Sequence, residues 1–298
     1  MQSMTFRYWL ILVFVSLLWG GTFFFNAILI KVVSPWTLTA GRVTIGAIGV
    51  WAYLLFSPHK VPSDLKLWVF YFLLGAISYA LPFTAIAWGQ QQITGGLASI
   101  INAMAPMTML IVSHFWPDSE KATPQKLIGI FIGFMGVVIF TLPKVQAGAI
   151  NEIIAYLAVF SSSLLYAIGF NLVRKLKDHP PVVTAAGSLT GAAVIALIAA
   201  YLFDGAPENL SAPIVWSFLG LGLLSTSLAF SIMYYLLPKI GLVNFSTVTF
   251  MVPISAILLG TLLLGETIES IQLTGMAVIF LGLLFIDGRV LKRFTYQR

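Results

Sequence analysis

Two stretches of the chain, EKATPQKLIGIFIGFMG at residues 120–136 and ETIESIQLTGMAVIFLG at residues 266–282, share one pattern. Each begins with a glutamate, carries a glycine 9 positions later and another glycine 7 positions after that. Each also follows a proline inside an apolar run, Pro106 in the first case and Pro253 in the second. We interpret the two stretches as copies of one ancestral segment.

The correspondence extends well beyond these stretches. A shift of 147 residues pairs Pro106 with Pro253, Gly75 with Gly222, Trp19 with Tyr166 and Phe23 with Phe170. The alignment needs one extra residue in the first half, before Glu120. We therefore expect two related repeats, residues 1–150 and residues 151–298.

The composition predicts that both repeats lie in a membrane. Of the 298 residues, 59% are hydrophobic and 9% are charged, whereas charged residues make up about 25% of an ordinary globular domain. A bilayer core about 30 Å thick needs about 20 apolar residues per helix, and the first apolar run exceeds the core of a signal peptide, about 7 to 15 residues. Ten spans are predicted at residues 8–30, 36–56, 67–89, 95–116, 125–142, 152–173, 182–203, 213–236, 242–264 and 271–286.

Five spans per repeat is an odd number, so the second copy enters the membrane in the opposite orientation to the first. The fold class expected is an all-α integral membrane protein with ten transmembrane helices, arranged as two inverted five-helix repeats. With the N-terminus inside, 13 of the 16 lysines and arginines fall on the cytoplasmic side, and Lys31 and Lys144 fall outside. Because cytoplasmic loops are rich in basic residues, both termini are expected in the cytoplasm.

Several classes of function are excluded by what the sequence lacks. The chain has no cysteine, and its three histidines lie at or beyond the ends of apolar runs. It has no metalloprotease, serine-hydrolase or P-loop pattern, so we expect no catalytic residue, no metal, no cofactor and no enzymatic activity. The formal charge of +6 is spread over short gaps between apolar runs, which argues against nucleic-acid binding.

The run Leu18-Trp19-Gly20-Gly21-Thr22-Phe23, Arg42, the proline of the fourth span and Gly265-Glu266 resemble the EamA branch of the drug/metabolite transporter superfamily. The resemblance covers essentially the whole chain and is strongest to bacterial exporters of amino acids, the aromatic type included. It implies a small-molecule substrate, a bacterial inner membrane, and function as a monomer because both repeats belong to one chain. Asp118-Ser119-Glu120 stands where the family has Gly-Glu, which weakens the assignment of Glu120.

Aromatic and amide side chains recur at helical spacing in several spans. Such stripes are typical either of packing and lipid contact or of a cavity wall, and an asparagine facing lipid would be costly. The candidate substrate-binding residues are Trp19, Phe23 and Asn26 in the first span, Tyr79 and Phe83 in the third, and Tyr166 and Phe170 in the sixth.

Three prolines inside spans each remove a hydrogen bond from the carbonyl four residues earlier. Pro82, Pro106 and Pro253 are the candidate hinges, and Ser78, Asn102 and Thr249 are the residues that lose the bond. These polar residues either repair the helix locally or line the pathway. Asn102 and Thr249 are therefore further substrate-binding candidates.

Charged residues are nearly absent from the spans. Arg42 is interpreted either as a contact to a substrate carboxylate or as a structural cation that pairs with helix-end carbonyls near the outer interface. All ten acidic residues lie in loops or at span ends, which favours exchange or facilitated efflux, although Glu120 and Glu266 remain candidate coupling sites.

Small residues mark one face of the fifth span and one face of the tenth. Such faces let helices approach closely, so these residues should pack, on one another and outside any cavity. They are Gly129, Gly133, Gly136, Gly275 and Gly282.

The function expected is export of small amphiphilic metabolites, amino acids and aromatic ones above all, by alternating access. The alternatives are proton-coupled efflux of drugs or aromatic cations and, in another class, a membrane channel or scaffold. An intramembrane enzyme would need converging catalytic side chains, which the sequence does not show.

Overall fold

The computed structural model describes residues 5–117, 121–205, 211–245 and 247–287, and these residues are mostly helical, with no strand among them. They form eight helical stretches long and apolar enough to cross a membrane, together with two shorter apolar helices. The first five spans contain α1 (Phe6–Leu29), α2 (Pro35–Leu55), α3 (Leu65–Gly75), η1 (Ala76–Ala80), α4 (Leu81–Gly89), α5 (Gly95–Asn102), α6 (Ala105–Phe115) and α7 (Pro124–Gln146). The last five contain α8 (Ile150–Val173), η2 (Arg174–Leu176), α9 (Pro181–Ala199), η3 (Ala200–Asp204), α10 (Ala212–Leu219), η4 (Gly220–Leu228), α11 (Ala229–Phe245), α12 (Val248–Leu264) and α13 (Ser270–Asp287).

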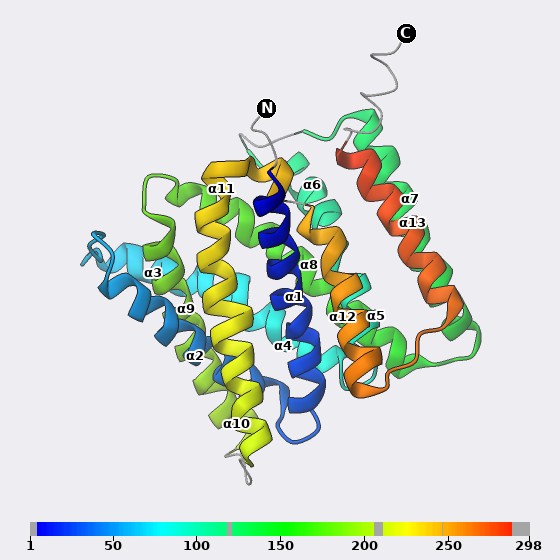
Figure 1. Cartoon of the computed structure of the whole chain (residues 1–298), viewed down its shortest axis with the longest axis horizontal. Helices are drawn as coiled ribbons and strands as arrows, with labels where there is room; N and C mark the ends of the chain where they lie inside the picture. The colour runs from blue at the N-terminus through cyan, green and yellow to red at the C-terminus, as the bar shows by residue number, and fades with distance from the viewer. Residues whose placement is uncertain (1–4, 118–120, 206–210, 246, 288–298) are drawn as a thin grey trace.

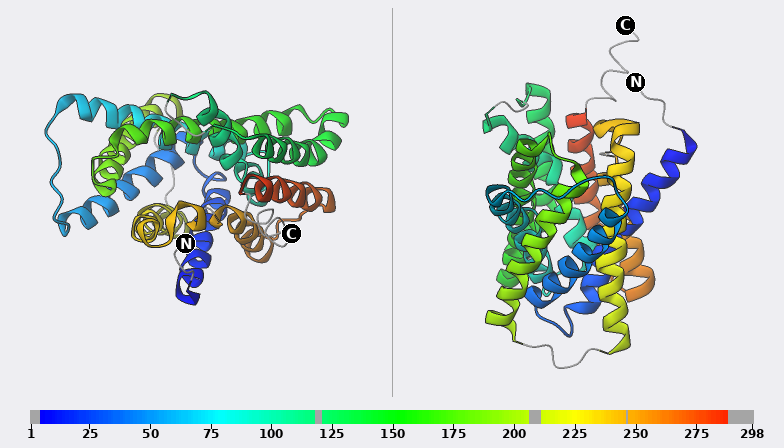
Figure 2. Two further views of the ribbon diagram at one scale, coloured as in Figure 1. Left: turned by 90° about the horizontal axis from the view of Figure 1, so that it is seen from above. Right: turned by 90° about the vertical axis from the view of Figure 1, so that its left-hand side faces the viewer.

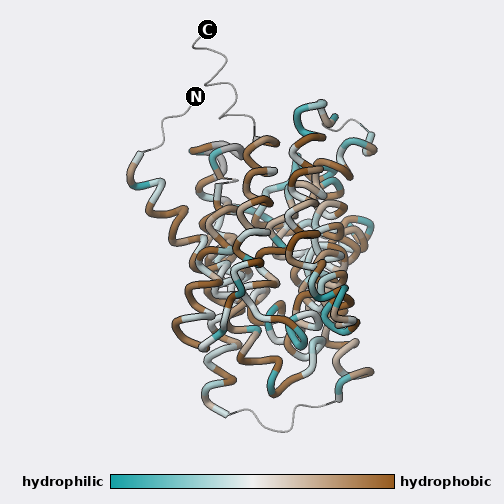
Figure 3. Tube along the Cα trace, turned by 90° about the vertical axis from the view of Figure 1, so that its right-hand side faces the viewer, coloured by the Kyte–Doolittle hydropathy of each residue, from teal (hydrophilic) through white to brown (hydrophobic). Residues whose placement is uncertain are grey.

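The helices stand side by side in one bundle, in which the start of α1 and the end of α13 lie at the same end (Figure 1). Apolar segments fill the height of the bundle, and hydrophilic segments gather toward its ends and connections (Figure 3). The ten-helix membrane fold predicted from the sequence is confirmed. We use "distal end" for the opposite end of the bundle, which carries the loops at residues 30–34, 90–94, 147–149 and 265–269.

Local sequence explains where several helices begin. Prolines occupy a first-turn position in α2, α7 and α9, where the missing N–H costs no hydrogen bond. The side chains of Thr94 and Thr123 accept from the N–H groups of Leu97 and Lys126, and so cap α5 and α7.

Several spans depart from a regular α-helix, and two of them do so at related positions. The third span passes through the π-helical segment η1 at residues 76–80, and the eighth passes through η4 at residues 220–228. The shift of 147 places η1 on residues 223–227, inside η4. The fourth span is interrupted between α5 and α6, directly before Pro106, whereas α12 keeps Pro253 within a continuous helix.

The boundary between the eighth and ninth spans differs from the prediction. The predicted spans at residues 213–236 and 242–264 leave residues 237–241 as a loop, but α11 continues through these residues to Phe245, and α12 begins at Val248. Near the end of α11, Asn244 donates from its side chain to the carbonyl of Ile240 at 2.8 Å. A proline deletes one helical hydrogen bond, and a membrane helix can tolerate that loss, so Pro238 does not end this helix.

The shift of 147 residues relates the contacts between spans as well as the sequences. Several pairs of packed spans have a counterpart pair at the shifted positions. α1 of the first span packs on α12 of the ninth, as α8 of the sixth packs on α5 and α6 of the fourth. α9 of the seventh span packs on α3 of the third, as α2 of the second packs on η4 of the eighth. α2 also packs on α9, and α7 on α13, which lie together at one edge of the bundle (Figures 1 and 2).

Candidate functional site

Aromatic side chains from four spans meet inside the bundle. We call Trp19, Tyr79, Phe83, Tyr166 and Phe230 the aromatic cluster. Tyr79 lies edge to face against Phe83 and Phe230, with ring centroids 5.7 and 5.8 Å away. Phe83 is buried, but the other four members are half-buried even though they lie between spans. Neighbouring side chains therefore cover these four rings only in part.

The cluster is built from positions related by the shift of 147. Trp19 meets Phe230 at 6.3 Å between ring centroids, and Tyr166 meets Phe83 at 6.4 Å. Trp19 corresponds to Tyr166, and Phe83 corresponds to Phe230, so these two contacts are counterparts. The sequence prediction missed Phe230, which the same shift applied to Phe83 would have found.

Arg42 lies against this cluster, and only 4% of the residue is exposed. Its guanidinium carbon is 3.5 Å from the centroid of the Phe83 ring, a cation–π contact. Its Nε donates to the hydroxyl of Thr226 at 3.2 Å, and that hydroxyl donates to the carbonyl of Leu221 in η4. The side chain therefore points into the bundle, away from the helix-end carbonyls that the structural interpretation required.

The η4 segment supplies two polar partners of α2. Besides Thr226, Ser227 donates to the carbonyl of Gly46 at 2.8 Å. A Cβ on Gly222 would collide with Ile45, so the glycine allows η4 to approach α2 closely. The irregular backbone of the eighth span thus places Thr226 beside Arg42, in keeping with the frequent occurrence of π-helical turns at functional sites.

Three predicted binding residues lie elsewhere. Phe23 is buried in the apolar core beside Ile86 and Leu97. The side chain of Asn26 is fully buried and donates to Gln90 at 2.9 Å. Phe170 is 36% exposed on the bundle surface. Helical spacing placed all three on the faces that carry Trp19 and Tyr166, but it could not show which neighbouring span each face meets.

The predicted hinge residues occupy different settings. Pro82 lies just after η1, and Asn102 is the last residue of α5, where it accepts from Ser162 at 3.5 Å. Thr249 is half-buried in the first turn of α12. None of these side chains takes part in the ring contacts that define the aromatic cluster, although Pro82 precedes Phe83.

The five small residues of the fifth and tenth spans come together between α7 and α13. A Cβ on Gly129 would lie 2.6 Å from the carbonyl oxygen of Gly282, and a Cβ on Gly136 would lie 2.6 Å from that of Gly275. A Cβ on Gly133 would instead meet the flexible end of Met107. This helix pair lies at the edge of the bundle (Figure 1), and the ring contacts of the aromatic cluster join residues of other helices.

Two carboxylates at the distal end of the bundle each bind the N-terminal turn of another helix. Glu266 accepts from the N–H groups of Gly95 and Gly96 at 3.0 and 3.2 Å, at the start of α5. Asp204 accepts from the N–H and hydroxyl of Thr37 at 2.7 and 3.0 Å, in the first turn of α2. Negative charge is favourable at helix N-termini. Glu120, the predicted counterpart of Glu266, lies outside the described residues.

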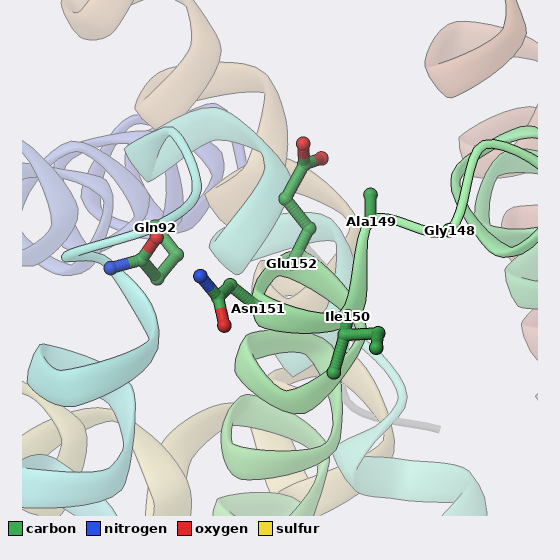
Figure 4. Close-up of a pocket in the computed structure, with 6 residues that line it drawn as sticks. All are labelled: Gln92, Gly148, Ala149, Ile150, Asn151 and Glu152. Carbon is green, nitrogen blue, oxygen red and sulfur yellow. The ribbon is translucent and has the colours of Figure 1, made fainter.

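Two cavities open at this end. One, of about 450 Å³, is lined by Lys31, Gln90, Gln91 and Glu266 among others. The second, of about 410 Å³, is lined by Gln92 and residues 148–152, and in Figure 4 Gln92 and Asn151 turn toward each other across it while Glu152 points away. Lys144 pairs with Glu152 at 3.2 Å and with Glu269 at 3.8 Å nearby.

The apolar spans define the class as a polytopic membrane protein, and the aromatic cluster with the buried cation Arg42 inside the bundle is typical of a transporter. The EamA-like transporter family matches the chain twice, over residues 7–142 and residues 153–287, and the chain belongs to this family. The resemblance to the EamA branch that the sequence motifs indicated is confirmed, and the protein is a transporter of small molecules in a lipid bilayer and not an enzyme.

Two curated relatives are similar over nearly their whole length. "Uncharacterized transporter YoaV" of Bacillus subtilis is 26% identical over 290 residues, which cover 95% of this chain and 96% of the relative. "Uncharacterized inner membrane transporter YedA" of Escherichia coli is 25% identical over 280 residues, which cover 91% and 87%. A solved structure matches with a TM-score of 0.65 at 18% identity, over 92% of this chain and 96% of the other, and it shows the fold alone.

Proposed function

We propose that the protein exports small amphiphilic metabolites, with aromatic amino acids favoured, by alternating access between two inverted repeats at residues 1–150 and 151–298. The observation that carries the proposal is the aromatic cluster, whose counterpart contacts Trp19–Phe230 and Tyr166–Phe83 join the two repeats. A site shared by two similar scaffolds can open to either side when one scaffold tilts against the other.

The chemistry of the cluster supports an amphiphilic cargo. Aromatic rings offer apolar faces to the body of a solute, while Arg42 offers hydrogen-bond donors to one polar group. A strongly anionic cargo fits poorly, because Arg42 is the single charged residue well inside a predicted span.

The proposed orientation places both termini in the cytoplasm of a bacterial inner membrane, with the distal end outside. The distribution of lysines and arginines supports it, and so does the position of the start of α1 and the end of α13 at one end of the bundle. Because both repeats are in one chain, we propose that a monomer is sufficient.

Exchange or facilitated efflux is the proposed driving mode. Glu266 lies at the distal end and uses its carboxylate to bind backbone N–H groups. Both of its carboxylate oxygens are engaged by these N–H groups, which supports a structural task.

Transport in proteoliposomes tests the proposal. Counterflow of labelled L-phenylalanine, L-tryptophan and L-leucine should be saturable and should proceed without an imposed pH gradient. If transport occurs only with an imposed pH gradient, the driving mode is proton coupling and not exchange. Efflux of aromatic cations in place of amino acids would contradict the cargo class, and conductance that does not saturate would indicate a channel.

A further inference from the structure

Among the residues that the structure describes, Arg42 is a buried cation without a carboxylate neighbour. Its contacts include the Phe83 ring on one face and the Thr226 hydroxyl on Nε, and its charge also interacts with the nearby Tyr166 side chain. The described ion pairs belong to Lys144 at the distal end. Removing a charge from water without a counter-charge is unfavourable, so this arrangement calls for an anion.

The edge of the guanidinium that best binds an anion is free. Among the described residues, the single hydrogen bond from Arg42 uses Nε, which leaves Nη1 and Nη2 without a protein acceptor. These two nitrogens carry donors in a fixed planar geometry that matches a carboxylate. Thr226 and Phe83 hold the group from one edge and one face, so its orientation is set before any ligand arrives.

The surroundings of Arg42 favour a carboxylate attached to an apolar body. Phe83, over which the guanidinium stacks, contacts Tyr79 and Tyr166 in the aromatic cluster. The half-buried rings of this cluster leave apolar surface uncovered. An inorganic anion would satisfy Arg42 but would leave these rings in contact with water.

The two repeats carry different residues at the position of Arg42. The shift of 147 places Leu189 of α9 at the position that corresponds to Arg42, and Leu189 is fully buried. The site therefore has one anion-binding side and one apolar side.

We infer that Arg42 binds a single carboxylate of the transported solute through Nη1 and Nη2, with the apolar body of the solute against the aromatic cluster. This assignment rests on the proposed function and narrows its cargo to organic solutes that bear one carboxylate. Thr226 acts as a positioning residue, because it holds Nε and does not reach the ligand itself.

Equilibrium binding to the purified full-length protein in detergent tests the assignment. Three probes share one ring and a similar chain: 3-phenylpropionate, its amide 3-phenylpropionamide, and 2-phenylethylammonium. We expect the carboxylate to bind at least about tenfold more tightly than the amide, since a charge-assisted pair is lost, and the ammonium to bind most weakly. This comparison needs no variant, so it stands even if Arg42 variants do not fold.

Variants then locate the effect. Arg42→Gln should remove the preference for the carboxylate, and Arg42→Lys should retain part of it. Lys31→Gln, which changes a cation of the distal cavity, is the matched control and should leave the preference intact. Thr226→Val should weaken carboxylate binding and leave amide binding unchanged. Thermal unfolding and monodispersity establish that each variant is folded.

Two results would overturn the assignment: binding of the amide or ammonium that equals or exceeds binding of the carboxylate, or a preference that persists in folded Arg42→Gln. Either result leaves export itself open to the separate counterflow measurement. Failure of counterflow for every amino acid would defeat the proposed function, whatever the binding data show.

Discussion

At the scale of single residues, Phe230 joins the two sides of the aromatic cluster, since it contacts both Trp19 and Tyr79. Edge-to-face ring pairs add about 0.5–1.5 kcal/mol beyond simple burial. Replacing Phe230 with alanine should therefore lower amino-acid counterflow about threefold to tenfold. Phe131→Ala removes an equal side chain from the lipid-facing surface and is the control; equal loss in both variants would contradict a role for the cluster.

Glu266 permits a second prediction at this scale. Its carboxylate accepts two backbone N–H groups of α5, and loss of such a helix cap costs about 1 kcal/mol. Glu266→Ala should lower the midpoint of thermal unfolding. Glu269→Ala, in the same loop, removes an exposed carboxylate that reaches Lys144 at 3.8 Å and should change the midpoint far less. A larger effect at position 269 would refute this account.

Sequence reasoning identified Trp19 and Tyr166 of the cluster from their repeat-related positions in two spans. It identified Tyr79 and Phe83 from their shared face of the third span. It left the task of Arg42 open, since depth in a span does not reveal whether a long side chain turns inward or toward the interface. The contact with Phe83 and the bond to Thr226, a residue 184 positions away, depend on packing between spans.

At the scale of elements, the pair α7–α13 is held by backbone-to-backbone proximity. A Cβ on Gly136 would lie 2.6 Å from a carbonyl oxygen and 2.8 Å from a backbone nitrogen of α13, whereas a Cβ on Gly133 meets a movable methionine end. Gly136→Ala should therefore destabilise the protein by about 1–3 kcal/mol, and Gly133→Ala by clearly less. Thermal unfolding of the two variants measures the difference, and a reversed order would contradict the packing.

Hydropathy predicted where most helices begin and end, but it did not predict the breaks within spans. Hydropathy cannot distinguish a π-helical turn from an α-helical one, so η1 and η4 were invisible in the sequence. The sequence LPKIG at residues 237–241 has the residues of a loop, yet α11 continues through it. Proline and glycine lower helix stability by a few kcal/mol at most, which neighbouring spans can offset.

At the scale of the whole molecule, cysteine labelling can test the proposed orientation of the chain in the membrane. The chain has no cysteine, so single cysteines can be introduced without background labelling. Ala147→Cys, in an exposed position between α7 and α8, should react with an impermeant maleimide in intact cells. Ser63→Cys, exposed between α2 and α3, should react only after permeabilisation. The reverse pattern would invert the proposed orientation.

The length of α12 sets a condition on the lipid around this transporter. Seventeen residues at about 1.5 Å per residue give roughly 26 Å of helix, against a hydrocarbon thickness of about 30 Å. Ile254, Leu258 and Leu262 are exposed along this helix, so acyl chains meet it directly. The bilayer beside α12 is therefore expected to become locally thinner. Phospholipids with shorter acyl chains should reduce the difference between the helix length and the hydrocarbon thickness.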